Sequence, residues 1–364
     1  MDWEIFCQKV FSYSAEIEGG KFKVLKKVIE KAFAVRVIEN GKVGFASGRD
    51  LEKTMEEAKK LARISEEELK NFPFEKPAKV EKLYDPRFEN LTPDYIKEEY
   101  ERLKGVVERA KIANAVITHE IFDVELRNSY GAELREKGSF SFFSIETVYG
   151  EGSGFAQTQS REIELDIEET AKYAEELAIK ASKSEKIESG YYDVILMPQA
   201  IHQLFSHTLY PSLSAENVAR GRSALYKGKY LGKLRIIDDP TIPGGFVSYS
   251  FDDEGVAAKR KVLVDGEVIG FYSDWKNAEK FGATGNGLRM SIDSPPIPLP
   301  SNVIVEVYDK AEDSSAFKDK AVKGVMIYGN IFELLKQIEG SCFKVLQIEN
   351  TISPAIRFKR VRVV

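Results

Sequence analysis

The stretch AVRVIENGKVGFA, residues 34–46, decides the fold of the N-terminal half of this chain. Both of its flanks are rich in β-branched and aromatic residues, and the Asn40-Gly41 pair between them is a strong signal for a two-residue β-hairpin. Residues 23–46 therefore predict two strands that turn at this dipeptide.

The residues after the hairpin alternate between helix and strand patterns. Asp50 is a suitable N-cap for a helix, and Thr92-Pro93 begins a second helix in the expected order of N-cap and first turn. The expected elements are helices at 51–64, 93–114 and 166–182 and strands at 116–128, 131–150 and 154–164. They predict an α+β domain at residues 1–188, an antiparallel sheet with helices on one face, which ends in the polar segment 183–190.

The second half, residues 189–364, is predicted to be a mostly antiparallel β domain. Pro198 follows a short apolar strand and stands in the first turn of a helix that carries two histidines. The remaining strands are expected at 234–238, 262–264, 268–272, 303–308, 325–328, 344–348 and 356–363, with helices at 274–281 and 331–338. Two domains are typical of a chain of 364 residues.

The composition narrows the class of protein and its compartment. Charged residues make up 30% of the chain with a net charge of -5, and no long block of one sign occurs, which does not favour a nucleic-acid binder. The start of the chain lacks the pattern of a signal peptide, and no apolar run approaches the ~20 residues that span a bilayer. The two cysteines lie at opposite ends of the chain and give no disulfide framework. We therefore expect a cytoplasmic protein without a membrane segment.

Two of the three histidines, His202 and His207, lie within six positions of one helix. Neutral imidazole is a good zinc ligand, so the pair is a candidate metal site. On an ideal helix, however, residues five apart are separated by ~140° around the axis, and both face one ion only if the helix bends. Geometry alone thus favours one packed and one solvent-facing histidine.

Two further segments are candidates for substrate binding. Asp253 and Glu254 belong to an acidic run beside a predicted turn, which either holds a cleft loop or is solvated, as acidic turn residues most often are. Gly285, Asn286 and Gly287, followed by Arg289, form a permissive loop with a fixed positive charge. This loop either clamps a peptide carboxylate or main chain, or is a tight turn with an exposed arginine.

Several segments, taken in their order and spacing, resemble the TldD/TldE family, also called PmbA or modulators of DNA gyrase. They are AVRVIENGKVGFA (34–46), NSYGAELREKGSFSFFSIETVYGEGSGFAQTQSR (128–161), LSAENVARGRSAL (213–225), FDDEGVAAKRKVLVDGEVIGFYSD (251–274) and ATGNGLRMS (283–291). The resemblance implies a zinc metallopeptidase that acts as a heterodimer on peptides or loosely folded chains.

In this family the TldD partner carries His-Glu-x-x-x-His and a cysteine ligand near its C-terminus, and the TldE partner lacks the metal set. Here Gln203 stands where the general-base glutamate is expected, and the cysteine position falls near Asn350, about eight residues after Cys342. The implied metal ligands are His202, His207 and Cys342. The chain also lacks much of the glycine-rich region that the family places between residues 303 and 329.

The favoured hypothesis is a TldE/PmbA-like subunit of a TldD-type metalloprotease, without a catalytic base of its own, and with zinc in the partner subunit or absent. Two alternatives stay open. One is an active metallopeptidase that uses the implied ligands with Glu216 or Glu254 as the base. The other is a non-enzymatic homodimer that binds a peptide.

Overall fold

The structure is a computed structural model that describes residues 1–309 and 325–364. All of the strands predicted for the second half of the chain lie within these ranges. Much of segment 303–329, which is expected to be shorter than in the family, lies outside them.

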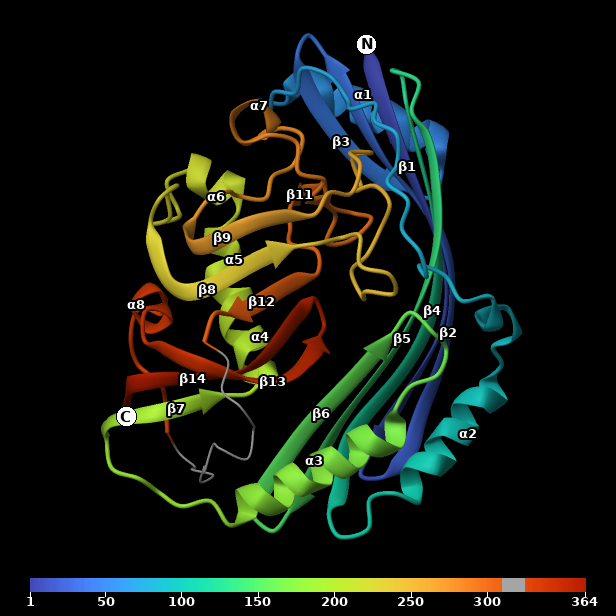
Figure 1. Ribbon diagram of the computed structural model, residues 1–364. Coiled ribbons are helices and arrows are strands. Elements are labelled where there is room, and N and C mark those ends of the chain that lie inside the picture. The colour runs from blue at the N-terminus through green and yellow to red at the C-terminus, as the bar shows by residue number, and fades with distance from the viewer. Residues whose placement is uncertain (310–324) are drawn as a thin grey trace.

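The N-terminal half is built on a six-stranded antiparallel sheet with the order β3-β2-β1-β4-β5-β6. Its long strands curve around the C-terminal half like half of a barrel (Figure 1). The strands are β1 (Asp2–Glu18), β2 (Lys21–Glu39), β3 (Lys42–Gly48), β4 (Lys111–Asn128), β5 (Glu133–Tyr149) and β6 (Gly152–Ser160). The predicted hairpin joins β2 and β3, and Asn40 and Gly41 both have positive φ there.

Helices cover one face of this sheet. They are α1 (Leu51–Ile64), α2 (Pro93–Lys104) and α3 (Ile167–Ser182), and a short 3₁₀ helix, η1 (Pro86–Asn90), precedes α2. The side chains of Asp50 and Thr92 accept hydrogen bonds from the first turns of α1 and α2, as their positions in the sequence predict. The α+β class is confirmed, with the helices on the convex face.

Because side chains alternate along a strand, the other face of the sheet is turned toward the C-terminal half. Ile17 and Ile117 belong to the core beneath α2 and α3. Phe6 and Leu126 instead pack against Phe251, which belongs to the C-terminal half.

Several elements differ from the sequence-based expectation: residues 325–328 form only an isolated bridge between Ile327 and Val363, and the helix expected at 274–281 is limited to Ala278–Phe281. β1 has no counterpart among the predicted strands; it is joined to β2 by Gly19 and Gly20, which both have positive φ. α2 ends at Lys104 and not near residue 114, because the chain turns after Gly105 and β4 begins at Lys111. In place of the separate strands expected at 262–264 and 268–272, a single strand, β9 (Lys261–Val268), runs through residues 265–266.

The C-terminal half contains a second sheet with the order β13-β14-β12-β8-β9, and β7 also pairs with β14. Only β12 and β14 pair in parallel among these described strands, so the expectation of a mostly antiparallel domain is confirmed. Its strands are β7 (Gly190–Leu196), β8 (Tyr230–Asp238), β9, β12 (Val303–Val307), β13 (Ile338–Ile348) and β14 (Thr351–Val363), and β10 (Gly287–Leu288) and β11 (Ile297–Pro298) form a separate pair. Its helices are α4 (Pro198–His207), α5 (Leu209–Ser212), α6 (Ala215–Ala219), α7 (Ala278–Phe281) and α8 (Ile331–Leu335).

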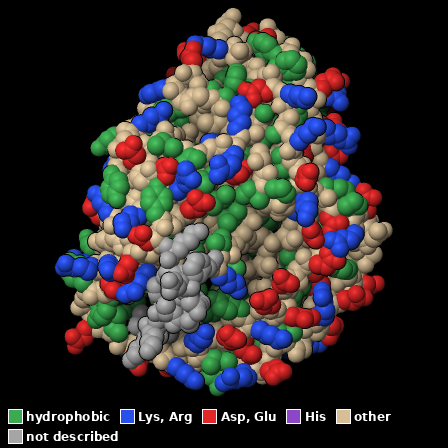
Figure 2. All heavy atoms as spheres, in the orientation of Figure 1, with side chains coloured by type: hydrophobic (Ala, Val, Ile, Leu, Met, Phe, Trp, Pro, Cys, Tyr) green, Lys and Arg blue, Asp and Glu red, His purple; other side chains and the backbone are tan. Residues whose placement is uncertain are grey.

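The boundary predicted at residue 188 falls in the connection between α3 and β7. α4 packs on the C-terminal sheet, where Ile201 and Phe205 enter the same core as Phe358 of β14. In the part of the chain that the structure describes, no helix has the length and apolar character needed to cross a bilayer. Positive and negative side chains are interspersed over the face in Figure 2.

Candidate functional site

The buried histidine of α4, His202, is held by the turn between β13 and β14. Its Nδ1 lies 2.9 Å from Thr351 Oγ1, and its Nε2 lies 3.4 Å from Glu349 Oε2. Thr351 Oγ1 also lies 2.8 Å from the hydroxyl of Tyr210, so that the threonine joins a histidine and a tyrosine. Both ring nitrogens of His202 therefore have partners from the protein itself.

The other implied ligands are not gathered around His202. His207 ends α4 and is exposed, as is Gln203. Cys342 is buried in β13, where its thiol donates to the carbonyl of Lys344 at 3.5 Å. Among residues 1–309 and 325–364, no group of three or more His, Cys, Asp or Glu side chains could hold a metal ion. One buried and one exposed histidine is the arrangement that the helix geometry favours.

The turn at Glu349-Asn350 occupies the place where the family's cysteine was expected. Glu349 has a φ of 49°, which is uncommon for a residue other than glycine. The hydrogen bond from His202 lowers the pKa of the Glu349 carboxyl against the opposing effect of burial. A carboxylate and a hydroxyl thus contact the histidine here in place of a thiolate.

The acidic run 252–254 is not a solvated turn, which corrects one of the two expectations for it. Glu254 is 1% exposed; its Oε1 accepts from Arg36 Nη1 at 2.6 Å and its Oε2 accepts from the backbone N–H of Trp275 at 2.6 Å. Arg36 of β2 also donates through Nε and Nη2 to the two carboxylate oxygens of Glu4, at 2.9 Å each. Asp252 accepts backbone N–H groups from its own turn and from Gly287. The run therefore ties the N-terminal sheet to the C-terminal half.

Burial and charge oppose one another in this network. Burial raises the pKa of Glu4, and Arg36 counters it. Burial lowers the pKa of Arg36, but Glu4 and Glu254 outweigh that effect and keep the pKa above its ordinary value. Burial also raises the pKa values of Asp252 and Asp253. The network holds more carboxyl groups than guanidinium groups, so it favours bound protons.

The predicted glycine loop is brought to the same network, but its polar groups are already in use. Asn286 is fully buried and donates to Asp238 Oδ1 at 3.0 Å, while its Oδ1 accepts from Lys261 at 2.6 Å. A Cβ on Gly287 would lie 2.1 Å from a Glu254 carboxylate oxygen, and Gly285 has a φ of +68°. The glycines are thus explained by close packing and backbone conformation.

Arg289 is not an exposed arginine either, since its side chain is 3% exposed. Its guanidinium lies 5.1 Å from the ring of Phe6 and 5.5 Å from the ring of Phe45, and Nη2 lies 3.7 Å from Glu4 Oε1. Its backbone N–H donates to Asp253 Oδ2 at 2.7 Å. Burial lowers its pKa to about 10. The predicted substrate-binding residues thus lie in a buried network, in which Nε and Nη2 of Arg289 have no hydrogen-bond partner among the described residues, and a role in substrate binding stays a prediction.

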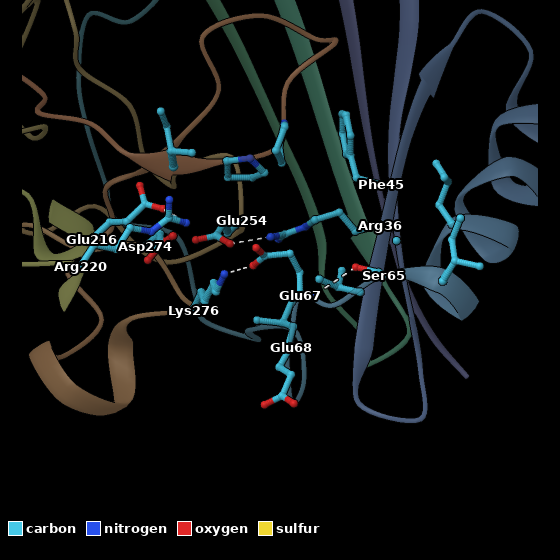
Figure 3. A pocket seen from close by; sticks show the side chains of 18 residues that line it. Arg36, Phe45, Ser65, Glu67, Glu68, Glu216, Arg220, Glu254, Asp274 and Lys276 are labelled. Carbon is cyan, nitrogen blue, oxygen red and sulfur yellow. Dashed lines mark hydrogen bonds and ion pairs between the residues drawn. The ribbon is translucent and has the colours of Figure 1, made fainter.

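A cavity of about 480 Å³ opens beside this network, between β3, α1 and the C-terminal half; we call it the Arg36 cavity (Figure 3). Figure 3 shows Arg36 and Glu254 pointing toward one another in its wall, with Lys276 and Glu67 paired next to them. It is lined by Arg36, Val43, Gly44, Phe45, Leu61, Ile64, Ser65, Glu67, Glu68, Leu69, Glu216, Arg220, Glu254, Asp274, Lys276, Pro295, Pro296 and Ile297.

Both candidate bases, Glu216 and Glu254, line the Arg36 cavity, whereas neither histidine of α4 does. Glu216 pairs with Arg220 at 2.8 Å. Asp274 was not predicted from the sequence; burial, and then the nearby Glu254, raise its pKa to about 6. The cavity therefore combines an apolar wall with one carboxyl group that can exchange a proton near neutral pH.

The third histidine forms a Ser-His-Glu arrangement that the sequence analysis did not find. His119 Nδ1 lies 2.7 Å from Ser141 Oγ, and its Nε2 lies 2.7 Å from Glu99 Oε2. The residue types are those of a hydrolase triad, but the two ring nitrogens have exchanged partners relative to it, and all three residues are fully buried between α2 and the sheet. No substrate carbonyl reaches Ser141, so the arrangement stabilises the fold.

Comparison with protein families accounts for most of the chain, up to residue 321. Residues 3–67 match domain 1 of the PmbA/TldA metallopeptidases, residues 86–193 match their central domain, and residues 189–321 match their C-terminal domain. A curved antiparallel sheet closed by a second β-rich half is thus the fold of a metallopeptidase family. The chain belongs to the PmbA/TldD family.

Relatives with known sequences or structures agree with this assignment. The uncharacterized protein MJ0231 of Methanocaldococcus jannaschii is 29% identical over 83% of this chain and 74% of its own length. A metalloprotease of Methanothermobacter thermautotrophicus is 25% identical over 89% and 84%. TldE from Thermococcus kodakarensis (TM-score 0.87) and a putative modulator of DNA gyrase from Thermotoga maritima (TM-score 0.85) share the fold, each at 22% identity over 100% of this chain and 96% of theirs.

Proposed function

We propose that this chain is the non-catalytic, TldE-like subunit of a cytoplasmic TldD-type zinc metalloprotease that acts on peptides or unfolded chains. The observation that carries the proposal is the state of the histidine helix. His202 uses both ring nitrogens on Thr351 and Glu349, and Gln203 stands in the place of the glutamate.

The donor groups do not fit a catalytic zinc ion. Such an ion takes three protein ligands and leaves one position for water, which a carboxylate base then deprotonates. Here His207 points to solvent while His202 is buried, and the thiol of Cys342 is bonded within its own strand. The amide of Gln203 has the shape of the glutamate carboxylate and no basicity. Loss of the base alone costs a factor of ~10² to 10⁴ in rate.

In this proposal the chain contributes binding surface to a heterodimer whose partner supplies zinc and the base. The Arg36 cavity supports the idea, because it places apolar side chains next to paired charges. Such a wall suits a peptide segment, which presents both apolar side chains and polar main-chain groups.

The test compares the purified chain alone with the same chain co-expressed with a TldD-type subunit. Zinc is measured by mass spectrometry, and cleavage of an unstructured fluorogenic peptide is followed with and without a chelator. We expect no stoichiometric zinc and no cleavage by the chain alone, and chelator-sensitive cleavage by the complex. Stoichiometric zinc with chelator-sensitive cleavage by the lone chain would overturn the proposal.

Two variants sharpen the comparison. Gln203→Glu returns the missing carboxylate but not a third ligand, so the lone chain is expected to stay inactive. His202→Ala is expected to leave cleavage by the complex intact if the variant assembles, since the partner holds the zinc. If this chain instead forms a stable homodimer and ignores the TldD-type subunit, the subunit role is wrong.

A further inference from the structure

A second cavity, of about 300 Å³, lies on the concave face of the N-terminal sheet; we call it the Glu120 cavity. Its floor is formed by neighbouring strands, with Glu120 and Phe122 from β4 and Phe140 from β5. Residues 246–249 and 288–292 of the C-terminal half close it from the other side. It lies wholly within this chain and away from the histidine helix.

Most charged groups that face this cavity already have partners. Glu136 of β5 accepts from the backbone N–H and the hydroxyl of Ser250. Arg161 donates to the carbonyl oxygens of Gly245, Ser139 and Ser248 at 3.1, 3.3 and 2.8 Å. Asp253 accepts the backbone N–H of Arg289, whose guanidinium lies near Glu4.

Glu120 is different, because within the described residues it has no hydrogen-bond or ion-pair partner. Its neighbours across the sheet are Ser12 of β1 and Phe140 of β5, neither of which carries a charge. Burial alone raises the pKa of this carboxyl to about 7. A carboxylate that is withdrawn from water without compensation is a strong site for an added cation.

We propose that the Glu120 cavity binds an alkylammonium group, such as the side chain of a lysine in a peptide. The ammonium would donate to Glu120, and the apolar stem would lie along Phe122 and Phe140. Aromatic rings add to this preference, because a cation over a ring face is attracted by its quadrupole. The stem of a lysine is apolar over four carbons, which matches an aromatic wall beside a carboxyl group that has no partner among the described residues.

An ammonium fits this site better than the planar guanidinium of arginine. A guanidinium presents five donors in a rigid fork and needs several acceptors, whereas Glu120 is the one carboxyl here without a partner among the described residues. The cavity already contains Arg161, whose guanidinium lies 5.4 Å from the ring of Phe122 and donates to three carbonyl groups. A second guanidinium would compete for the same ring.

Binding is expected to depend on pH with a definite sign. The ammonium group stays charged below about pH 10. Glu120 loses its proton as the pH rises through about 7, so affinity should increase between pH 6 and 8. Burial also raises the pKa of Glu136 and of Asp253, which face the same cavity together with Arg161 and Arg289. The contribution of Glu120 is therefore taken as the difference between the pH profiles of binding to the wild type and to Glu120→Gln.

The experiment is isothermal titration of the full chain with capped tripeptides, acetyl-Gly-Lys-Gly-amide and its norleucine analogue, and with butylamine as a free amine. The lysine peptide should bind about tenfold more tightly than the norleucine peptide at pH 8, as expected for a charge-assisted hydrogen bond. Preference for butylamine over the lysine peptide would assign the site to free amines, which keeps the alkylammonium class and excludes a peptide source.

Glu120→Gln should abolish the preference for lysine, and Glu125→Gln, which changes the same charge on the opposite face of β4, should retain it. Glu125 pairs with Lys9 at 3.4 Å and does not line the cavity. Equal binding of the lysine and norleucine peptides, or a lysine preference that survives in Glu120→Gln, would overturn the proposal. If Glu120→Gln does not fold, the wild-type preference must still rise from pH 6 to pH 8, and a flat profile would refute it. None of these outcomes depends on zinc or on a partner subunit.

Discussion

Replacement of Arg36 by methionine tests the buried ion network in the most direct way. Methionine keeps much of the length of the side chain and removes the charge. The carboxylates of Glu4 and Glu254, which are 0% and 1% exposed, would then lose the cation that lies within 3 Å of both. The variant Arg36→Met therefore leaves Glu254 with the N–H of Trp275 and Glu4 with the more distant Arg289, and neither buried carboxyl group keeps a cation within 3 Å.

The expected cost is about 3–5 kcal/mol of unfolding free energy, the usual effect of removing one partner from a buried ion pair. That is a large part of the ~5–15 kcal/mol that stabilises a typical protein. A matched control is Arg49→Met: Arg49 pairs with Glu30 at 2.9 Å, but the two side chains are 81% and 43% exposed. Loss of an exposed pair of this kind costs at most about 1 kcal/mol.

The assay is urea unfolding of both variants at pH 5 and pH 8. Burial raises the pKa of Glu4 in the native protein, and loss of Arg36 removes the opposing effect. An acid with a raised pKa in the folded state keeps its proton at low pH, and its stability contribution is lost as the pH rises through that pKa. The deficit of Arg36→Met should therefore be smaller at pH 5 than at pH 8. A deficit no larger than that of Arg49→Met, or one that grows toward pH 5, would refute the reasoning.

Three further outcomes are expected. Gly44→Ala should destabilise the fold by at least about 1–3 kcal/mol in thermal unfolding, because its Cβ would lie 2.2 Å from backbone atoms of α1; an unchanged melting temperature would contradict this packing. Thr351→Val should cost about 1–3 kcal/mol in urea unfolding, because it leaves His202 Nδ1 and the Tyr210 hydroxyl without their shared partner; Thr351→Ser should restore most of the loss. Glu120→Gln should flatten the pH dependence of stability, since the raised pKa of Glu120 makes the wild type lose roughly 2 kcal/mol between pH 4.5 and 7; parallel profiles would speak against a buried, unpartnered carboxyl.

Local signals predict the local structure of this chain well. The Asn40-Gly41 turn and the caps at Asp50 and Thr92 lie where the sequence places them, because each depends on a few adjacent residues. β1 was not predicted although its alternate residues from Trp3 to Ile17 are apolar except for Lys9, so its sequence does carry the period-two signal of a half-buried strand. The predicted end of α2 is too late in the chain, because the helical pattern continues past Lys104 into residues that form the start of β4.

The site was harder to predict, because its partners are distant in the chain. Arg36 and Glu254 are 218 residues apart, and no spacing rule links them. One signal was available: a charged residue in the apolar run AVRVI needs a buried partner, and Glu4 in the apolar start of the chain is its counterpart. The histidine helix, in contrast, was placed correctly from Pro198 and its apolar spacing, since that information is local.

The position of Glu254 links the ion network to the Arg36 cavity and limits the chemistry that the cavity can perform. Glu254 lines the cavity, yet both of its oxygens are occupied by Arg36 and by the N–H of Trp275. Each oxygen of Glu254 thus already accepts a hydrogen bond, and Glu216 is engaged by Arg220. Asp274 is the carboxyl group in this wall that combines a raised pKa with partners from its own turn only. Asp274 interacts electrostatically with Glu254, so a charge bound next to Asp274 would also act on the ion pair that joins the two halves of the protein.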